Sequence, residues 1–417
     1  MSLVLSLSGL DGAARALDVI GNNIANSQTI GFKTSKVRFA DVFAASVTGA
    51  PTTGLGAGVS AGIVEQEFTQ GNVAQSDNPL DMAISGKGFF RLNNGGTITY
   101  SRDGQFQLTY DASTPNTRSL VNRSGLNVTG YPADYTVDPR GVIMTGAAPQ
   151  NISIDTLMPA AATTAVTVGA TLDARAVAPA VAFNPNNSLS YNGTAGVTVF
   201  DAAGASHSLM MYFVKSAPGN LWDLYTTMDG GSQTGPTALS FDTQGQLTTA
   251  MPLAAGGIPA VSLDLTGTVQ YGRTFSVDSI THDGYPNGAI QSASGFSVGS
   301  DGVIQASYSN GQSRKVGQIV LATFVNPEAL FSLGDNQWMP NGDPVRGSGT
   351  VTLDTPGRST GTTPMGLGSI QGGAKELSNV DLSTELVAMI EQQRNYQASA
   401  QTLKIQDQVL QNLVNAR

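Results

Sequence analysis

The sequence contains no cysteine and only two histidines, His207 and His282. The absence of cysteine excludes disulfides, thiolate metal sites and cysteine nucleophiles together. Two isolated histidines cannot form a histidine-rich metal site, and the sequence contains no Asp- and Asn-rich calcium loop. We therefore expect no metal, no cofactor and no catalytic residues.

Charged residues are also scarce. They make up 12% of the 417 residues, against about 25% in an average protein. The net charge of −9 argues against a nucleic-acid partner, which needs clustered Lys and Arg to neutralise phosphates. Glycine is abundant, with 49 residues. A polar surface with few charges is typical of an extracellular β-rich protein or of one that packs against itself.

Long apolar segments are missing as well. No run approaches the roughly 20 apolar residues of a membrane-spanning helix, so we expect no membrane insertion. The N-terminus does not read as a cleavable signal peptide, because it lacks a positively charged start and polar residues or glycines interrupt its apolar residues at Ser8, Gly9, Asp11 and Gly12. If the protein leaves the cytoplasm, another export route must carry it.

The two ends of the chain carry apolar residues at helical spacing. The N-terminal stripe predicts a helix of roughly 23 residues that Asn22, Asn23, Asn26 and Gly31 end, and it comprises Leu3, Leu7, Leu10, Ala14, Leu17 and Ile24. Ser378 to Asp381 is a helix-start signal for the C-terminal segment. The heptad-like seam of that segment comprises Leu382, Leu386, Met389, Gln393, Tyr396, Ala400, Leu403, Asp407, Leu410 and Val414.

These two helices can form one coiled-coil-like rod only if the chain returns to where it began. An ordinary pair of amphipathic core helices is the alternative interpretation. With few charges and no other predicted helices, however, a monomer would leave apolar surface uncovered, which favours self-association. We predict that both ends are mobile in the monomer and become helical on assembly.

Between its ends the chain reads as short strands and glycine-rich turns, including the segment 53–59. The predicted fold is mixed and mainly β, with two nested β-rich domains. Its domains are a helical end domain (1–31 plus 376–417), a linking region (32–76 plus 366–375), a core β domain (77–145 plus 286–365) and an inserted outer β domain (146–285).

One motif could carry catalysis. Gly295 to Gly299 matches the Gly-x-Ser-x-Gly nucleophile elbow around Ser297. That elbow requires a helix after the serine and a histidine later in the chain. Here Ser300-Asp301-Gly302 predicts a turn, and both histidines precede Ser297. The motif therefore does not predict a hydrolase, and we expect no enzyme.

The end segments carry a resemblance to a known family. Leu17 to Asn26 reads LDVIGNNIAN, Gly31-Phe32-Lys33 follows, and the C-terminal end contains Ser378 to Leu382 and Gln393 to Gln397. Leu80 to Ile84, Gly88-Phe89-Phe90 and Tyr100 to Phe106 agree with these ends. Together these motifs resemble the bacterial flagellar rod and hook family over nearly the whole chain, most weakly in 150–285.

Within that family the large inserted region is similar to hook subunits rather than to the shorter distal rod proteins. The resemblance implies a structural subunit of the flagellar hook that polymerises into a curved, flexible helical tube and transmits torque from rod to filament. It also implies export through the flagellar type III apparatus without a cleaved signal peptide, and an extracellular position in the basal body and hook.

The implied partners are other copies of the chain, the hook cap, the distal rod and the hook–filament junction proteins. A distal rod subunit is the alternative within the family, and a secreted carbohydrate-binding surface protein is a more distant one. The subunit interface is predicted at the helical ends, at Leu7, Leu10, Leu17, Asn22, Asn23, Ile24, Asn26, Leu382, Leu386, Met389, Tyr396, Leu403, Leu410 and Val414.

Overall fold

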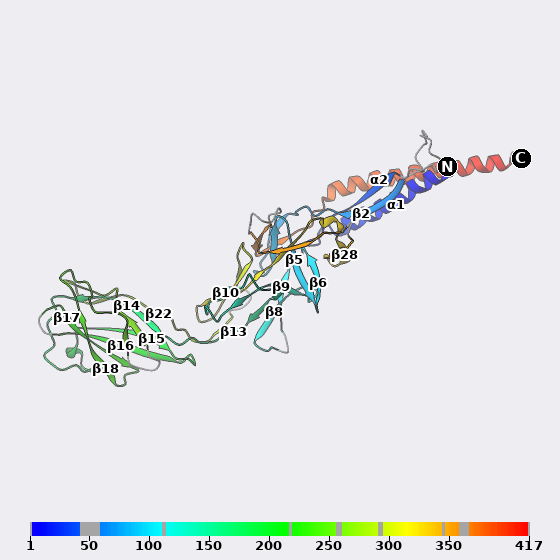
Figure 1. Cartoon of the computed structure of the whole chain (residues 1–417). Helices are drawn as coiled ribbons and strands as arrows, with labels where there is room; N and C mark the ends of the chain where they lie inside the picture. Colours follow the sequence, from blue (N-terminus) through cyan, green and yellow to red (C-terminus); the bar gives the residue numbers. More distant parts are fainter. Residues whose placement is uncertain are drawn as a thin grey trace. The chain divides into compact units, whose positions relative to one another are not determined.

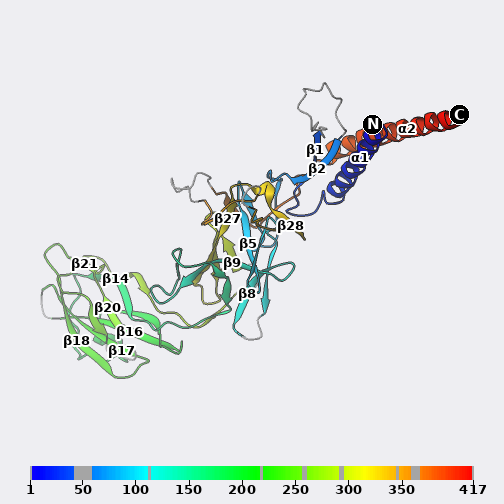
Figure 2. The ribbon, with the colours of Figure 1, turned by 45° about the vertical axis from the view of Figure 1, so that its right-hand side comes forward.

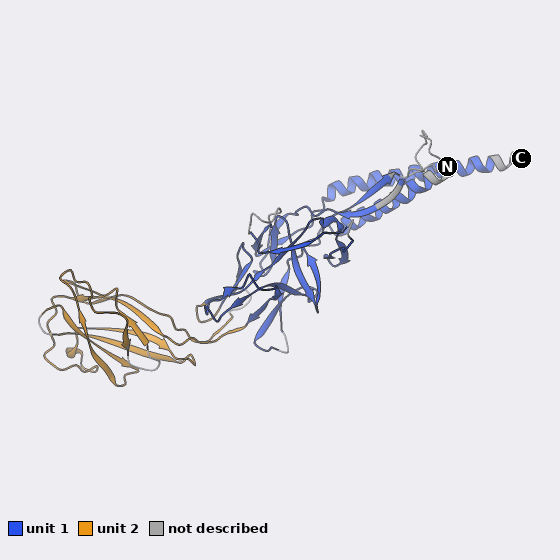
Figure 3. Cartoon of the chain, viewed as in Figure 1, with its two compact units in different colours: residues 1–155, 292–307, 313–417 blue, residues 156–291, 308–312 orange. Residues whose placement is uncertain are grey.

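The computed structural model describes residues 2–41, 59–110, 114–216, 219–255, 261–290, 295–343, 347–357 and 367–415. Most of the glycine-rich segment 53–59 lies outside these ranges. The chain divides into two compact units (Figure 3). Unit 1 comprises residues 1–155, 292–307 and 313–417, and unit 2 comprises residues 156–291 and 308–312.

Unit 1 holds the two α-helices of the described chain, α1 (Ser2–Ala25) and α2 (Leu382–Asn415). They lie side by side in both views (Figures 1 and 2). The pair is antiparallel, because Gln406 Nε2 donates to Ser6 Oγ near one end and Asn23 Nδ2 donates to Glu385 Oε1 near the other, both at 3.2 Å. The predicted pairing of the two ends is therefore confirmed.

α2 begins directly after the predicted start signal, Ser378 to Asp381. Asp381, rather than Ser378, caps the helix, because its carboxylate accepts from the backbone N–H groups of Ser383 and Thr384. A carboxylate at this position satisfies the unpaired N–H groups of the first turn. Ser378 Oγ instead accepts from Val380 N, before the helix begins.

The β part of unit 1 is one large strand network with small two-stranded sheets beside it. The network follows the order β24-β25-β26-β9-β5-β6-β29-β28, with β7, β8, β10, β11, β12, β27 and β30 attached. Its strands and 3₁₀ turn are β5 (Phe89–Asn94), β6 (Thr97–Ser101), β7 (Phe106–Tyr110), β8 (Thr117–Asn122), β9 (Asn127–Asp134), β10 (Val142–Ile143), β11 (Gln150–Asn151), β12 (Ser153–Asp155), β24 (Phe296–Val298), β25 (Val303–Ser307), β26 (Ser313–Ile319), β27 (Leu321–Phe324), η3 (Pro327–Ala329), β28 (Phe331–Gly334), β29 (Gln337–Met339) and β30 (Val351–Asp354).

Small antiparallel sheets bring the C-terminal part of the chain back to its N-terminal part. β3 (Val73–Gln75) pairs with β32 (Ala374–Glu376), and β4 (Met82–Ser85) pairs with β31 (Ser369–Gly372). A third sheet joins β1 (Ser35–Asp41) to β2 (Val59–Gln66) next to the helices. These pairings place the end of the N-terminal segment beside the start of the C-terminal one, as a single rod requires.

An aromatic cluster fills part of the core of unit 1. Phe68, Phe89, Phe324 and Trp338 contact one another edge to face, with ring centroids 5.2 to 5.8 Å apart. Such pairs are worth about 0.5–1.5 kcal/mol each beyond their buried area. The cluster ties the linking segment to the strand network.

Unit 2 is a sandwich of two sheets around its own core. One sheet has the order β15-β16-β17-β18, and the other has β19-β20-β14-β21 with β22 paired to β14. Buried residues of both sheets, such as Val168, Leu209 and Trp222, share one cluster. The elements are β13 (Leu157–Met158), β14 (Ala165–Asp173), η1 (Ser188–Ser190), β15 (Gly193–Phe200), β16 (Ser206–Lys215), β17 (Leu221–Met228), β18 (Gln233–Ser240), β19 (Leu253–Ala255), β20 (Val261–Asp264), β21 (Val269–Tyr271), β22 (Ser276–His282) and β23 (Gly288–Ala289).

The chain enters and leaves unit 2 at neighbouring points. Leu157 and Met158 pair with Ala289 and Gly288 in the short β13–β23 sheet. The strands β11 and β12, which lie inside the sequence range assigned to the inserted domain, belong to unit 1.

The segment around Ser297 is a hairpin. Ser297 is exposed on β24 and pairs with Gln305 of β25, and Gly302 N donates to Gly299 O in the turn between the strands. The predicted turn after the serine is confirmed.

Candidate functional site: the helical ends and their junction with the β core

A glycine of α1 lies at a close approach to α2. Ala13 and Ala16 are buried, and a Cβ atom added to Gly9 would lie 3.3 Å from Ser399 Oγ of α2. A larger side chain in place of Gly9 would therefore require Ser399 to move. Gly12 plays the same part toward the β1–β2 sheet, where an added Cβ would lie 3.1 Å from Phe39 Cε1.

The described residues of the predicted apolar stripes are exposed or half-buried in the single chain. On α1, Leu7 is exposed and Leu10, Leu17 and Ile24 are half-buried. On α2, Met389 and Leu403 are half-buried, the side chain of Val414 lies outside the described ones, and Leu382, Leu386, Tyr396 and Leu410 are exposed. The assignment of these residues to an interface between subunits stays a prediction, and their exposed or half-buried side chains remain available for such a contact.

α2 consequently presents apolar side chains on faces that α1 does not cover. Its exposed large apolar residues are Leu382, Leu386, Val387, Ile390, Tyr396, Ile405, Val409 and Leu410. A helix that is apolar around much of its circumference is normally buried. The helical pair of one chain therefore leaves a surface that further packing would cover.

The three asparagines at the end of α1 differ in burial and in their hydrogen bonds. Asn23 is buried, and its side chain accepts from Ser35 N and donates to Ser35 O as well as to Glu385 of α2. Asn26 Nδ2 donates to Asn22 O and its Oδ1 accepts from Thr29 Oγ1, so it closes the last turn of the helix. Asn22 is exposed. One of the three thus fixes α1 to both β1 and α2.

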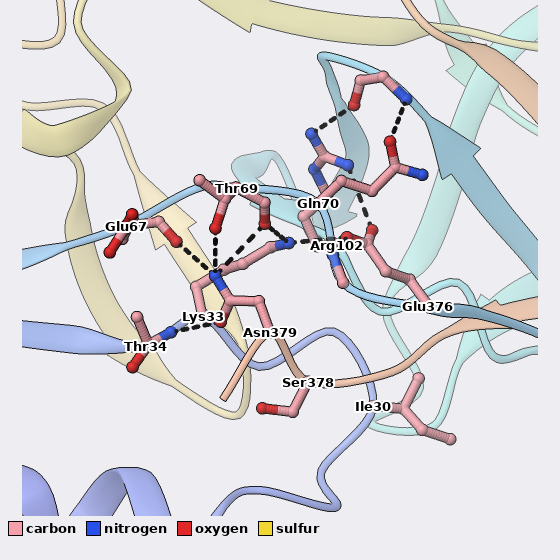
Figure 4. Close-up of polar contacts among 12 residues, drawn as sticks. Ile30, Lys33, Thr34, Glu67, Thr69, Gln70, Arg102, Glu376, Ser378 and Asn379 are labelled. Atoms are coloured by element: carbon pink, nitrogen blue, oxygen red, sulfur yellow. Dashed lines mark hydrogen bonds and ion pairs between the residues drawn. The ribbon is translucent and has the colours of Figure 1, made fainter. Parts of the chain in front are cut away.

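Unit 1 contains a buried charge cluster, which we call the junction cluster: Lys33, Arg102 and Glu376. Figure 4 shows the three side chains converging from separate segments. Lys33 Nζ lies 2.7 Å from Glu376 Oε1, and Arg102 Nη1 lies 3.2 Å from Glu376 Oε2. None of the three side chains is more than 3% exposed. The cluster joins the N-terminal segment, the C-terminal segment and the β core.

Backbone groups complete the junction cluster. Glu376 Oε1 also accepts from Gly71 N at 2.9 Å, Lys33 Nζ donates to Thr69 O at 2.6 Å, and Arg102 Nη2 donates to Gly86 O at 2.9 Å. The carboxylate of Glu376 is thus the shared acceptor of the cluster. Because a buried charge is tolerated only when it is paired and hydrogen-bonded, each segment depends on the others.

The junction cluster holds two cations and one anion. Burial lowers the pKa of Lys33, an effect that the charge of Glu376 opposes and that of Arg102 reinforces. Burial likewise lowers the pKa of Arg102, against the influence of Glu376. A guanidinium nevertheless stays charged in proteins. Glu376 is therefore the group whose loss would leave the largest uncompensated charge.

Further polar contacts join the segments that lie between the junction cluster and the two helices. Asn379, just before α2, accepts from Thr34 N at 2.7 Å and donates to Glu67 O at 2.9 Å. Gly31 N donates to Glu376 O at 2.9 Å. The segment that follows α1 and the segment that precedes α2 are therefore held to each other and to the start of the β core.

Asp103 lies beside this junction in the turn after β6. Burial raises the pKa of its carboxyl to about 6, although Gln105 N donates to it. Gly31 packs directly against its backbone: at a φ of +72°, an added Cβ would lie 2.6 Å from Asp103 N. This contact requires glycine on both steric and conformational grounds.

Sequence reasoning missed the junction cluster. Lys33 and Glu376 are 343 positions apart, and no spacing rule predicts such a pair. The scarcity of charged residues could have indicated the cluster, because Lys33 and Arg102 lie within motifs that are otherwise mostly apolar or uncharged.

Two further properties of the described residues bear on function. Neither described helix is long and apolar enough to cross a membrane. Within the described ranges, no group of three or more His, Asp or Glu residues could hold a metal ion.

Comparison with known proteins identifies the family. Four family models match: "Flagella basal body rod protein" at 5–33, "Flagellar hook protein FlgE/F/G D1 domain" at 83–171, "Flagellar basal body protein FlaE D2 domain" at 171–285 and "Flagellar basal body rod FlgEFG protein C-terminal" at 371–416. The matches cover both helical ends, the N-terminal part of the strand network and most of unit 2.

Full-length relatives agree. The chain is 42% identical over 432 residues to the flagellar hook protein FlgE of Escherichia coli, and 39% identical over 433 residues to that of Salmonella typhimurium, with all of each chain covered. The crystal structure of the Helicobacter pylori flagellar hook protein FlgE2 matches 72% of this chain and 99% of that one, at 15% identity and a TM-score of 0.49. The chain belongs to the flagellar hook protein FlgE family of structural proteins.

Proposed function

We propose that this structural subunit of the flagellar hook polymerises through its helical pair into a curved tube that transmits torque. The observation that carries the proposal is that α1 and α2 pair and leave leucines of α2 exposed. Exposed apolar patches of this kind mark sites of protein association. The predicted interface residues Leu382, Leu386, Tyr396 and Leu410 are among them.

Polymer geometry follows from the kind of contact. An interface between unlike surfaces that does not close into a ring generates a helical filament. The helical pairs would form the inner wall of such a tube, joined to the β units through the junction cluster. Repeated subunits with separate β units could bend without breaking the inner contacts. The role is structural and involves no catalysis.

The proposal includes the other proteins of the assembly. The tube would grow beneath a hook cap, start on the distal rod and end at the hook–filament junction proteins. The subunits would leave the cell through the flagellar type III apparatus without a cleaved signal peptide. Full-length similarity to hook proteins favours this assignment over a distal rod subunit.

Polymerisation of purified protein tests the proposal. The doubly substituted variant Leu382→Ser, Leu386→Ser should unfold at the same temperature as the unchanged monomer, because both side chains are exposed, yet form no tubes in electron micrographs. A chain lacking residues 382–417 should keep a soluble β core and also fail to polymerise. Gln397→Ser, an exposed polar change on α2, is the matched control and should assemble normally.

Normal tubes from the double leucine variant would contradict the proposal. Amide exchange adds an independent check, because ends that order on assembly should exchange fast in the monomer and slowly in the tube. Strong protection of α1 and α2 in the monomer would show that assembly does not order them. Ser297→Ala should change neither folding nor assembly.

A further inference from the structure

Unit 1 carries an open groove that is separate from the helical pair. Its walls are the β1–β2 sheet on one side and the η3–β28 segment on the other, and its volume is about 840 Å³. Phe39, Ile63, Val64, Leu330 and Phe331 supply the apolar lining. Ile63 is 65% exposed and Phe331 58% exposed, so the groove presents large apolar side chains to solvent.

One edge of the groove is acidic. Arg38 Nε lies 2.5 Å from Glu65 Oε2, and Glu328 and Asp343 also line the groove. The charges of Glu65 and Glu328 both act on the Arg38 guanidinium, so carboxyl groups outnumber the cation at this edge. The hydrogen bond with Glu65 raises the pKa of Glu328. An occupant that brought a cation to this edge would be favoured over a neutral or acidic one.

α2 has a face with the complementary pattern. Val387 and Ile390 are 66% and 52% exposed, and Arg394 is exposed as well. Their spacing of three and four residues places them on one side of the helix. Glu385 and Ser399, which contact α1 at Asn23 and Gly9, lie on the opposite side of the helix. The outward face, defined as Val387, Ile390 and Arg394, is thus apolar with a cation one turn further on.

We propose that the groove between β2 and β28 receives the outward face of α2 from a second copy of this chain. The inference rests on the proposed function, because it assigns one contact of the polymer. Val387 and Ile390 fill the apolar part of the groove, and Arg394 lies against Glu328 and Glu65. Within a single chain, α2 is occupied by α1 and turns these three side chains away from it.

The position of the groove supports this occupant. Phe39 lines the groove and also contacts α1 at Gly12, so the groove adjoins the helical pair. Groove and outward face are different surfaces of one chain, and such a pairing is head-to-tail and generates an open helix. One helix in one groove falls short of the roughly 1,200 Å² of a stable complex, so the contact holds only within a polymer.

The absence of cysteine makes the test direct. Tubes are polymerised from a majority of unchanged chain together with small amounts of an Ile63→Cys chain and an Ile390→Cys chain. Tube formation then does not depend on either variant. A disulfide forms only between Cα atoms within about 7 Å. Oxidation of the mixed tubes should give a disulfide dimer several-fold above the level in tubes that contain either variant alone.

In the control mixture, a Leu189→Cys chain takes the place of the Ile390→Cys chain. Leu189 is exposed on unit 2, and this mixture should give no such dimer. Mixed tubes with no dimer above this control overturn the proposal. Dimers of Ile63→Cys chains alone also overturn it, since the groove would then face another groove. Failure of the unchanged chain to form tubes contradicts the proposed function instead, so the two failures are distinguishable.

Charge reversal gives a second measurement. Arg394→Glu and Glu328→Arg should each raise the critical concentration for assembly by up to about 5-fold, as expected for one exposed ion pair. The doubly reversed chain should recover most of this loss. If the effects of the two single reversals on the critical concentration add up in the doubly reversed chain, the two side chains do not meet, and the pairing is overturned.

Discussion

Lys33 and Glu376 lie 343 positions apart in the chain, yet the Lys33 ammonium donates a 2.7 Å hydrogen bond to the Glu376 carboxylate, and both side chains are fully buried. Through this contact the segment after α1 and the segment before α2 are joined to each other. Arg102 attaches the pair to the strand network. The rod and the β core of unit 1 are therefore linked by charges that cannot be separated without leaving one of them unpaired.

The first prediction concerns the order of importance within the junction cluster. Glu376→Gln leaves two buried cations without an anion and should lower the free energy of unfolding by about 3–5 kcal/mol. Lys33→Met leaves the neutral Arg102–Glu376 pair and should cost clearly less, because it also removes the excess charge. Urea unfolding of the monomer measures both.

Lys36→Met is the matched control for that comparison. Lys36 forms an exposed ion pair with Glu67, with both side chains at least 40% exposed, and such pairs are worth about 0–1 kcal/mol. A Lys33→Met variant as unstable as Glu376→Gln would show that the excess positive charge of the cluster has no energetic weight.

The second prediction concerns pH. Because burial raises the pKa of Asp103 from 3.8 to about 6, the stability associated with its neutral form is fully present below pH 3.8 and is lost as the pH rises through 6. Asp103→Asn mimics the neutral form. At pH 7–8 the free energy of unfolding of this variant should exceed that of the unchanged protein by roughly 1–2 kcal/mol. This is less than the full pKa shift of Asp103 corresponds to, because solvent screens a half-buried group. At pH 4 the difference should nearly vanish.

Asp134→Asn provides a control of opposite sign. Hydrogen bonds from Thr136 lower the pKa of this exposed carboxyl, so the ionised form is the stabilising one. The substitution should therefore gain nothing at neutral pH. Thermal unfolding from pH 4 to 8 measures both variants, and an advantage of Asp103→Asn that grew toward acid would reverse the argument.

The third prediction concerns the turn at Gly31. Its φ of +72° and the 2.6 Å approach of an added Cβ to Asp103 N mean that Gly31→Ala is both strained and blocked. The left-handed conformation alone costs about 1–2 kcal/mol, and the clash with the backbone adds to it. Gly95 has a φ of +56° with nothing within 4 Å of an added Cβ. Gly95→Ala should therefore cost only the conformational part, and equal losses at the two positions would argue that Asp103 moves aside freely.

The fourth prediction concerns unit 2. Met158 pairs with Gly288, so the chain enters and leaves this unit at adjacent residues. Replacing residues 159–287 with a short Gly/Ser linker should leave unit 1 folded and able to polymerise, because the helical ends and the strand network remain. We expect tubes with altered curvature or stiffness in electron micrographs of hooks. Normal export without tubes would mean that unit 2 holds the polymer together.

The helical ends were predictable because their signal is local. Apolar residues three and four apart indicate a helix whatever the rest of the chain does, and both segments are helical. The hairpins at Asn94 to Gly96 and at Asp201 to Gly204 were predictable for the same reason, since glycine with Asn or Asp between alternating residues indicates a turn.

The face of each helix that makes the contact was not predictable from that pattern. Periodicity places Leu382, Leu386 and Leu410 on one stripe, but it does not say what the stripe meets. A close approach between α1 and α2 occurs at Gly9, which lies against Ser399. A glycine allows the two helices to approach closely there, while Leu382, Leu386 and Leu410 stay exposed.

The sequence by itself determined the secondary structure of the ends, the β character of the middle and the shortage of charge that makes each buried ion matter. Only the tertiary structure decided that Lys33, Arg102 and Glu376 meet. Their encounter depends on β3 pairing with β32 and β4 with β31, and such long-range pairing leaves no periodic trace in the sequence. The physical reason is that a buried charge needs a partner within hydrogen-bond distance, and only the folded chain supplies it.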